Sequence, residues 1–221
     1  MTPDNLSALA LSIRVALVAT LLNAAVGVPL AYVLARRRFR GRGLVDLLVT
    51  LPLVLPPTVT GYYLIVLLGR RGWLGGPIYG LTGWSITFTW YAAVVAATIM
   101  ALPLLVRTAR AAIESVDRDL EKAAFTLGRS EWRTALEVTL PLARNGILAG
   151  LVLAFARALG EFGATLMLAG NIPGRTTTVP LAIYTSVQTG ETGEALALVA
   201  MLTALSCVVL VVAGRLGARA T

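Results

Sequence analysis

Long apolar runs alternate with short polar segments along the whole chain. A helix needs about 20 apolar residues to cross the core of a bilayer, and five runs are long enough: 8–35, 44–69, 84–106, 146–169 and 195–214. The first run is too long for the apolar part of a signal peptide, and only Asp4 carries a charge before it. The pattern therefore predicts an all-α membrane protein with about five transmembrane helices.

Residues 118–142, RDLEKAAFTLGRSEWRTALEVTLPL, follow a different pattern, because apolar residues recur there at helical spacing among many charges. We expect two short amphipathic helices that hinge at Gly128, since glycine accepts a positive φ angle. Ser130 is placed to cap the second helix. Trp132 and Leu136 are expected to pack back against the spans, and Pro141 is expected to break the helix before the next span.

The remaining connections add no second domain. No linker, repeat or low-complexity tract divides the chain, so we expect one transmembrane domain over 1–221 with a long loop at about 107–145. The segment 170–194 is interrupted by Asn171, Pro173, Gly174 and Gly190, which is typical of a loop. Within it, VPLAIYTSVQ predicts a short helix that dips back toward the membrane.

Composition supports the membrane assignment. Of the 221 residues, 57% are hydrophobic and 14% are charged, and the mean hydropathy is +0.80, whereas about a quarter of the residues in a soluble domain are charged. The net charge of +8 does not indicate a nucleic-acid partner, because the basic residues lie between the apolar runs, where membrane proteins carry their cytoplasmic anchors.

The basic residues also predict the orientation. The segments 36–46, 107–145 and 215–221 hold five, seven and two Lys or Arg residues, 14 in all, against three in 70–83 and 170–194 together. Lys and Arg are enriched on the cytoplasmic side of membrane proteins. We therefore expect the N-terminus outside and both the long loop and the C-terminus in the cytoplasm.

The chain lacks the residues of several common active sites. It contains no histidine and one cysteine, Cys207, which excludes a Cys/His metal site, a histidine-based catalytic triad and an intramolecular disulfide. Its one lysine, Lys122, follows Glu121 and not the glycine of a nucleotide-binding P-loop. We therefore expect no enzymatic activity, and the energy for transport must come from a partner or from a gradient.

Two ionisable residues lie near the middle of the fourth run. Arg157 and Glu161 are four residues apart, so they share a helix face and can form an ion pair. One interpretation is a self-neutralising pair that fixes helix packing. The other is a pair that lines the translocation path or its gate, where a cancelled charge would not trap a dianion. Arg14 is near enough to the start of its span to reach the outer surface, and Asn23 is expected to bond a neighbouring helix.

Prolines and glycines indicate close packing and a water-accessible path. Pro56 and Pro57 are expected to bend the second span, which places it beside the path because freed carbonyls need protein or water nearby. Thr58 and Thr60 follow the bend and offer hydroxyls to a hydrated anion, unless both bond to their own helix backbone. Small residues on the fourth span are expected to allow close helix approach, as at a two-fold axis: Gly150, Gly160 and Gly163.

The segment KAAFTLG, followed by TLP, resembles the cytoplasmic "EAA" loop of ABC importer permeases. In that family the loop forms a coupling helix that sits in a cleft of the ATPase subunit. The resemblance implies that the coupling residues are Glu121, Lys122, Ala123, Ala124, Leu127 and Gly128, with Ala123 and Ala124 inserted. Aligned on Gly128, the family's glutamate falls at Lys122, with an acid one residue earlier, so the contact at that position is replaced or lost.

Two longer segments resemble the permease subunits of molybdate ABC transporters: LPLVLPPTVTGYYLIVLLGRRGWLG at 51–75 and LAFARALGEFGATLMLAGNIPGRTTTVPLAIYTSVQTG at 153–190. Sulfate permeases share ARALGEFG and AGNIPG, whereas the VPLAIYTSVQTG continuation is closer to the molybdate group. The resemblance implies a type I ABC importer permease fold and a homodimeric pore in a prokaryotic cell membrane. It also implies two ATP-binding subunits, which hold ATP and Mg²⁺ so that this chain binds no cofactor, and a periplasmic or extracellular oxyanion-binding protein.

The residues leave three functional classes open. An ATP-driven importer subunit for molybdate, tungstate or sulfate explains both the hinged loop and the ion pair. A secondary anion carrier or channel usually has more spans and repeated halves, which this chain lacks. A structural membrane protein leaves Arg157, Glu161 and the hinged loop unexplained. Co-purification of an ATPase separates the first class from the other two.

Overall fold

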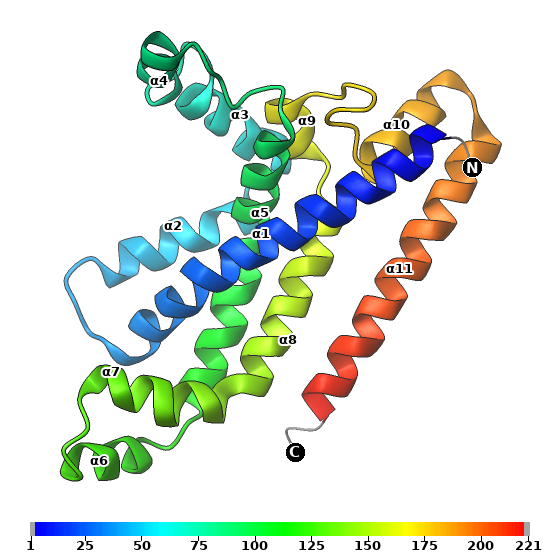
Figure 1. Cartoon of the computed structure of the whole chain (residues 1–221). Coiled ribbons are helices and arrows are strands. Elements are labelled where there is room, and N and C mark those ends of the chain that lie inside the picture. Colours follow the sequence, from blue (N-terminus) through cyan, green and yellow to red (C-terminus); the bar gives the residue numbers. More distant parts are fainter. Residues whose placement is uncertain (1–2, 219–221) are drawn as a thin grey trace.

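The computed structural model describes residues 3–218, with the side chains of residues 4–211, and every regular element in that range is a helix (Figure 1). In chain order the helices are α1 Pro3–Arg36, α2 Arg42–Val54, α3 Pro57–Leu68, α4 Gly75–Thr82, α5 Trp90–Glu114, α6 Arg118–Thr126, α7 Glu131–Thr134, the π-helical turn η1 Ala135–Thr139, α8 Leu140–Leu159, α9 Gly163–Ala169, α10 Val179–Thr189 and α11 Thr192–Ala218. The predicted cytoplasmic segment 215–221 lies beyond the side chains that are described.

Four helical stretches of the described chain are long and apolar enough to cross a membrane: Asp4–Arg36, Trp90–Glu114, Glu131–Leu159 and Thr192–Val211. They correspond to the first, third, fourth and fifth predicted runs. The helix of the third predicted run begins at Trp90 and not at residue 84, because Gly83 turns the chain with a φ of 66° and Thr89 is extended. It then continues to Glu114, inside the predicted loop.

The predicted second span, 44–69, is two helices and not one bent helix. α2 ends at Val54 and α3 begins at Pro57, while Leu55 and Pro56 between them are extended, with ψ angles of 143° and 136°. Each of these two residues precedes a proline, and a proline ring disfavours the helical conformation of the residue before it. The Pro56-Pro57 pair therefore separates two helices of 13 and 12 residues.

The predicted fourth span, 146–169, begins earlier and is interrupted. α8 is continuous with α7 and η1, so Pro141 does not break the helix as expected. Pro141 has no N–H to donate to the carbonyl four residues earlier, and the wider π-helical turn η1, directly before α8, accommodates this proline within the helix. At the other end α8 stops at Leu159, residues 160–162 are non-helical, and α9 resumes at Gly163.

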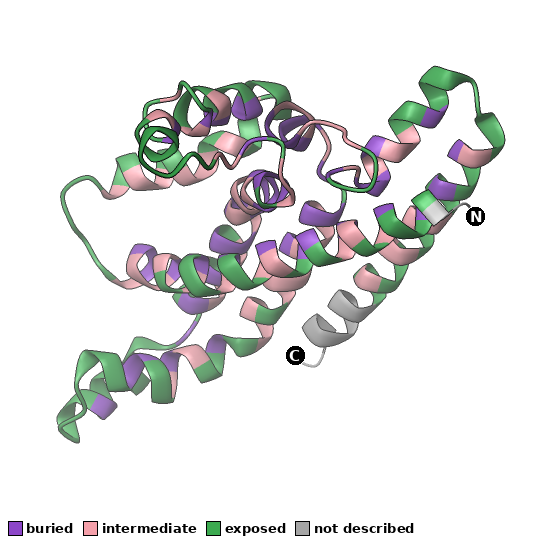
Figure 2. Cartoon of the chain, turned by 45° about the horizontal axis from the view of Figure 1, so that its top comes forward, coloured by how far each residue is buried: buried purple, intermediate pink, exposed green. Residues whose placement is uncertain are grey.

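The centre of the fold is α5, which packs against both α1 and α8. Its buried side is rich in alanine, and six alanines have no exposed surface: Ala92, Ala93, Ala96, Ala97, Ala101 and Ala109. A methyl group added at Gly150 of α8 would lie 3.1 Å from a methyl carbon of Leu105 on α5. The close approach predicted for Gly150 therefore occurs within the chain. Buried residues gather where these helices meet, whereas no residue of α2 is buried (Figure 2).

The predicted short helix in the segment 170–194 is confirmed as α10, which packs against α11. It lies at the end of the bundle opposite α6 and α7 (Figure 1).

Candidate functional site

The two hinged helices predicted at 118–142 are present as α6 and α7, which lie at one end of the bundle (Figure 1). α6 begins after Asp117, whose carboxylate accepts a hydrogen bond from the Asp119 N–H at 2.9 Å. The helix ends at Thr126, and the chain turns at Gly128, which has a φ of 79° and donates its N–H to the Phe125 carbonyl at 2.9 Å. The predicted glycine hinge is thus a glycine in the left-handed backbone conformation, which commonly follows the last turn of an α-helix. We call residues 118–134 the α6–α7 hairpin.

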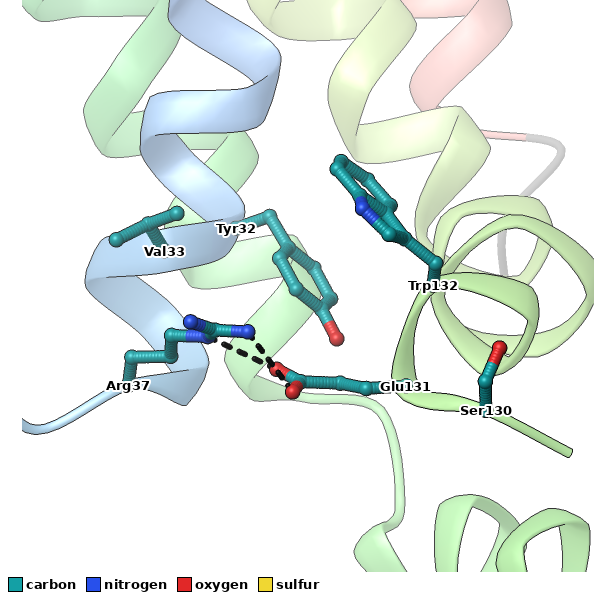
Figure 3. A pocket seen from close by; sticks show the side chains of 6 residues that line it. All are labelled: Tyr32, Val33, Arg37, Ser130, Glu131 and Trp132. Atoms are coloured by element: carbon teal, nitrogen blue, oxygen red, sulfur yellow. Dashed lines mark hydrogen bonds and ion pairs between the residues drawn. The ribbon is translucent and has the colours of Figure 1, made fainter.

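An ion pair with two hydrogen bonds joins α7 to the end of α1 (Figure 3). Nε and Nη2 of Arg37 donate to the two carboxylate oxygens of Glu131 at 2.9 and 2.8 Å. A cavity of about 430 Å³ lies beside this pair, with Tyr32 and Trp132 among its walls. Ser130 caps α7 as predicted. Because both charged side chains are exposed to water, the pair positions the hairpin more than it stabilises it.

Glu121 faces inward and ties α6 to two other elements. Its Oε1 accepts hydrogen bonds from Arg36 Nε at 3.0 Å and from the Thr139 hydroxyl at 2.6 Å. Arg36 also donates to the Val116 carbonyl at 3.0 Å. The Arg36 and Glu121 side chains are 7% and 11% exposed. The structure therefore places the acid that precedes Lys122 inside the chain, where it anchors α6 to α1 and η1.

The outer face of the hairpin carries four of the five remaining predicted coupling residues. Lys122, Ala123, Leu127 and Gly128 are exposed, whereas Ala124 is buried against the rest of the chain. Lys122 donates to Asp119 at 2.7 Å, and this exposed bond raises the pKa of Lys122 and lowers that of Asp119.

The second stripe does not pack as expected. Trp132 and Leu136 are 70% and 60% exposed, and the residues that face inward are Thr134, Ala135 and Thr139. Phe125, Leu127 and Trp132 of the hairpin, together with Leu136 of η1, are large apolar side chains that the described chain leaves exposed.

The breaks in the second and fourth spans lie against each other. A methyl group added at Gly163, the first residue of α9, would lie 2.9 Å from Pro57 Cβ and 3.3 Å from Thr58 N at the start of α3. A methyl group added at Gly61 of α3 would lie 2.7 Å from Met167 Cβ of α9. Glycines on both sides therefore let the two half-helices pack closely.

Arg157 and Glu161 form the predicted ion pair, with Nη1 and Oε2 2.7 Å apart. The pair spans the end of α8, because Glu161 lies in the break and not on a continuous helix face. The other oxygen of Glu161 accepts a hydrogen bond from the Ala164 N–H at 2.9 Å. Glu161 is 3% exposed, so this carboxylate both neutralises Arg157 and holds the start of α9.

The two threonines after the proline pair differ. Thr58 is exposed, whereas Thr60 is 6% exposed and its hydroxyl has no hydrogen-bond partner among the described residues. Thr98 and Thr108 donate to carbonyls four residues earlier, and Thr60 does not. The alternative in which Thr58 and Thr60 both donate to the backbone of their own helix is therefore wrong for Thr60.

The chain matches the family described as binding-protein-dependent transport system inner membrane component over residues 27–221. The chain belongs to this family. The molybdenum transport system permease ModB of Escherichia coli K12 is 48% identical to this permease over 197 residues, which cover 88% of this chain and 86% of that protein. A putative molybdenum transport system permease of Bacillus subtilis 168, YvgM, is 40% identical over 200 residues, covering 90% and 88%.

Solved structures confirm the predicted type I importer permease fold. The inward-facing MetNI methionine ABC transporter has a TM-score of 0.76 at 17% identity, covering 100% of both chains. A bacterial ABC transporter that imports alginate has a TM-score of 0.77 at 16% identity, covering 99% of this permease and 80% of that chain. The names of the relatives are those of transport permeases and not of enzymes, in agreement with the predicted membrane location and non-catalytic role.

Sequence reasoning missed the partners that hold the hairpin in place. The sequence alone indicates only cytoplasmic anchors at Arg36 and Arg37, and no pattern in it distinguishes Thr139. Arg36 is 85 residues from Glu121, and Arg37 is 94 from Glu131, so no local spacing connects them.

Among the described residues, no group of three Cys, Asp or Glu side chains could hold a metal ion.

Proposed function

We propose that the chain is the membrane-spanning permease subunit of an ATP-driven molybdate importer in a prokaryotic cell membrane. The observation that carries the proposal is the 48% identity to a molybdenum transport permease over 88% of the chain. Solved importer permeases of the same fold with other named substrates share only 16% and 17% identity. Molybdate is the proposed substrate because of the identity to molybdenum permeases. Tungstate and sulfate are the competing substrates, because they are also tetrahedral dianions.

Two copies of the chain, two ATP-binding subunits and an oxyanion-binding protein are proposed to form the importer. α2 supports the second copy, because it buries no residue within one chain and exposes Leu44, Leu47, Leu48 and Leu51. A two-fold axis beside α2 and α3 would cover this surface and enclose a path that one chain is too small to surround. The solved alginate transporter is described in complex with its periplasmic protein, which supports the same arrangement here.

The α6–α7 hairpin is the proposed contact with the ATPase. Its exposed apolar side chains suit a cleft in a partner, and the small Ala123 on this face allows close approach. The bonds of Glu121 and Glu131 to the end of α1 would pass a movement of the hairpin to that span. η1 and α8 follow α7 without a break, so the same movement would reach the fourth span. ATP and Mg²⁺ would be held by the ATPase subunits alone.

The translocation path is proposed to run beside the two facing breaks. Thr58 is exposed at the first break, and Arg157 and Glu161 lie at the second, where Gly163 contacts the start of α3. The ion pair would present a largely cancelled charge to a passing dianion, which favours weak and transient binding. The unpartnered hydroxyl of Thr60 is a further candidate for this path.

The test is reconstitution of the chain with its ATPase in vesicles and addition of the cognate binding protein. ATP-dependent uptake of molybdate should exceed uptake of sulfate at equal concentration. Sulfate uptake above molybdate uptake would replace the substrate assignment, and uptake without an ATPase would replace the importer class.

A further inference from the structure

An arginine and an aromatic ring are stacked at the end of the bundle opposite the hairpin. The Arg14 guanidinium carbon of α1 lies 4.0 Å from the centre of the Trp90 ring at the start of α5. Stacking of this kind attracts a cation to the ring face and holds its position. Arg14 is exposed and forms no ion pair among the described residues. Its charge is therefore held in place but not neutralised.

A second unpaired arginine lines the same cavity. Arg175, from the loop before α10, borders a cavity of about 430 Å³ together with Arg14, Trp84, Trp90 and Tyr91. Arg175 is exposed and also has no ion-pair partner in the described part of the chain. No acidic side chain is among the described residues of the cavity wall. Two guanidinium groups without a carboxylate favour an anionic ligand with oxygen acceptors.

The cavity continues into an apolar groove. A neighbouring cavity of about 450 Å³ shares Trp84, Trp90 and Tyr91 and extends along α1 and α5, where Val18, Leu22, Val94 and Val95 line it. Arg14, Val18 and Leu22 are spaced by four residues and so share one face of α1. At 1.5 Å per residue they extend along about 12 Å of the helix, a substantial part of a hydrocarbon core of roughly 30 Å.

We propose that this groove between α1 and α5 binds an anionic phospholipid, with the phosphate at Arg14 and Arg175 and an acyl chain along Val18 and Leu22. Trp and Tyr side chains are enriched at the level of lipid headgroups, and Trp84 and Tyr91 are half-exposed between the charged and apolar parts. A free oxyanion would fit the arginines but would leave the apolar groove uncovered. A second copy of the chain would have to bring an acid to each arginine.

The probe is phosphatidylglycerol, compared with phosphatidylcholine that has the same acyl chains. Binding to the intact purified assembly would be measured by native mass spectrometry and by titration in detergent. Inorganic phosphate and molybdate, added alone, distinguish a lipid from a free oxyanion. The double variant Arg14→Gln/Arg175→Gln removes the charges, and Leu22→Trp fills the apolar groove without changing charge. Arg71→Gln is the matched control, since Arg71 is exposed and lines neither cavity.

Phosphatidylglycerol should bind more tightly than phosphatidylcholine, and each lost arginine should weaken it about fivefold. Leu22→Trp should also weaken phosphatidylglycerol binding, whereas Arg71→Gln should leave it unchanged. Equal binding of the two lipids by the wild-type protein, or no binding to the intact assembly, overturns the proposal without any variant. Phosphate or molybdate binding that the arginine variant loses, with lipid binding unaffected, would assign the cluster to a free oxyanion. None of these readouts depends on transport, so the result is independent of the proposed substrate.

Discussion

The bonds of Glu121 are expected to be the strongest tie between the α6–α7 hairpin and the spans. Glu121→Ala would leave Arg36, with a 7% exposed side chain, beside an empty acceptor site and would remove the partner of the Thr139 hydroxyl. Removing one partner of a buried ion pair costs about 3–5 kcal/mol. Arg36 keeps its bond to the Val116 carbonyl, so we expect the lower end, about 3 kcal/mol.

The assay is hydrogen exchange of the α6 amides in the purified assembly. A loss of about 3 kcal/mol corresponds to roughly a 150-fold loss of protection if the hairpin opens locally. Lys122→Ala is the control on the same helix, because its bond to Asp119 is fully exposed and should contribute little. The double variant Arg36→Met/Glu121→Met should recover much of the protection, since it removes both buried charges.

Unchanged protection in Glu121→Ala would refute the reasoning, because it would show that α6 is held by other contacts. Strict additivity of the Arg36→Met and Glu121→Met effects would refute the pairing itself.

Three further predictions follow from the same structure. Gly128→Val should destabilise the hairpin by about 1–2 kcal/mol, because the φ of 79° and not a steric contact opposes a side chain there; hydrogen exchange of α6 measures it. Removing Arg157 or Glu161 alone should reduce stability more than replacing both with a neutral pair, and a thermal-unfolding double-mutant cycle that gives additive effects would contradict the coupling. Native mass spectrometry of the solubilised importer should show two copies of this chain with two ATPase subunits, and a stable, active complex with one copy would contradict the two-fold arrangement.

The bilayer explains why the spans were predictable and their ends were not. Span length is imposed by the hydrocarbon core, so apolar run length located α1, α5, α8 and α11. The breaks at Pro56 and Gly160 lie inside the predicted apolar runs, so the length of a run does not reveal them. The proline pair predicts a bend, but each proline ring also keeps the residue before it out of the helical conformation, so the helix is interrupted and not only bent.

Local spacing likewise located only part of the site. The glycine turn at Gly128, the cap at Ser130 and the Arg157–Glu161 ion pair depend on residues within a few positions of each other, and all three are present, although Glu161 lies in the break after α8. The direction in which α7 faces depends on α1, which is distant in sequence. Apolar spacing therefore predicts that Trp132 faces the packed side, whereas Thr134 and Ala135 occupy that side. The roles of these residues in coupling and transport remain predictions.

The central claim is that the exposed face of α6 couples an ATPase to molybdate movement. The most direct test measures molybdate uptake and ATP hydrolysis in the same vesicles for the wild-type chain and for Ala123→Glu, which adds a charge at an exposed position without disturbing the buried Ala124. We predict that Ala123→Glu remains inserted in the membrane but loses ATPase association, and with it both uptake and the hydrolysis that loaded binding protein stimulates. Wild-type uptake and stimulation in this variant would contradict the account.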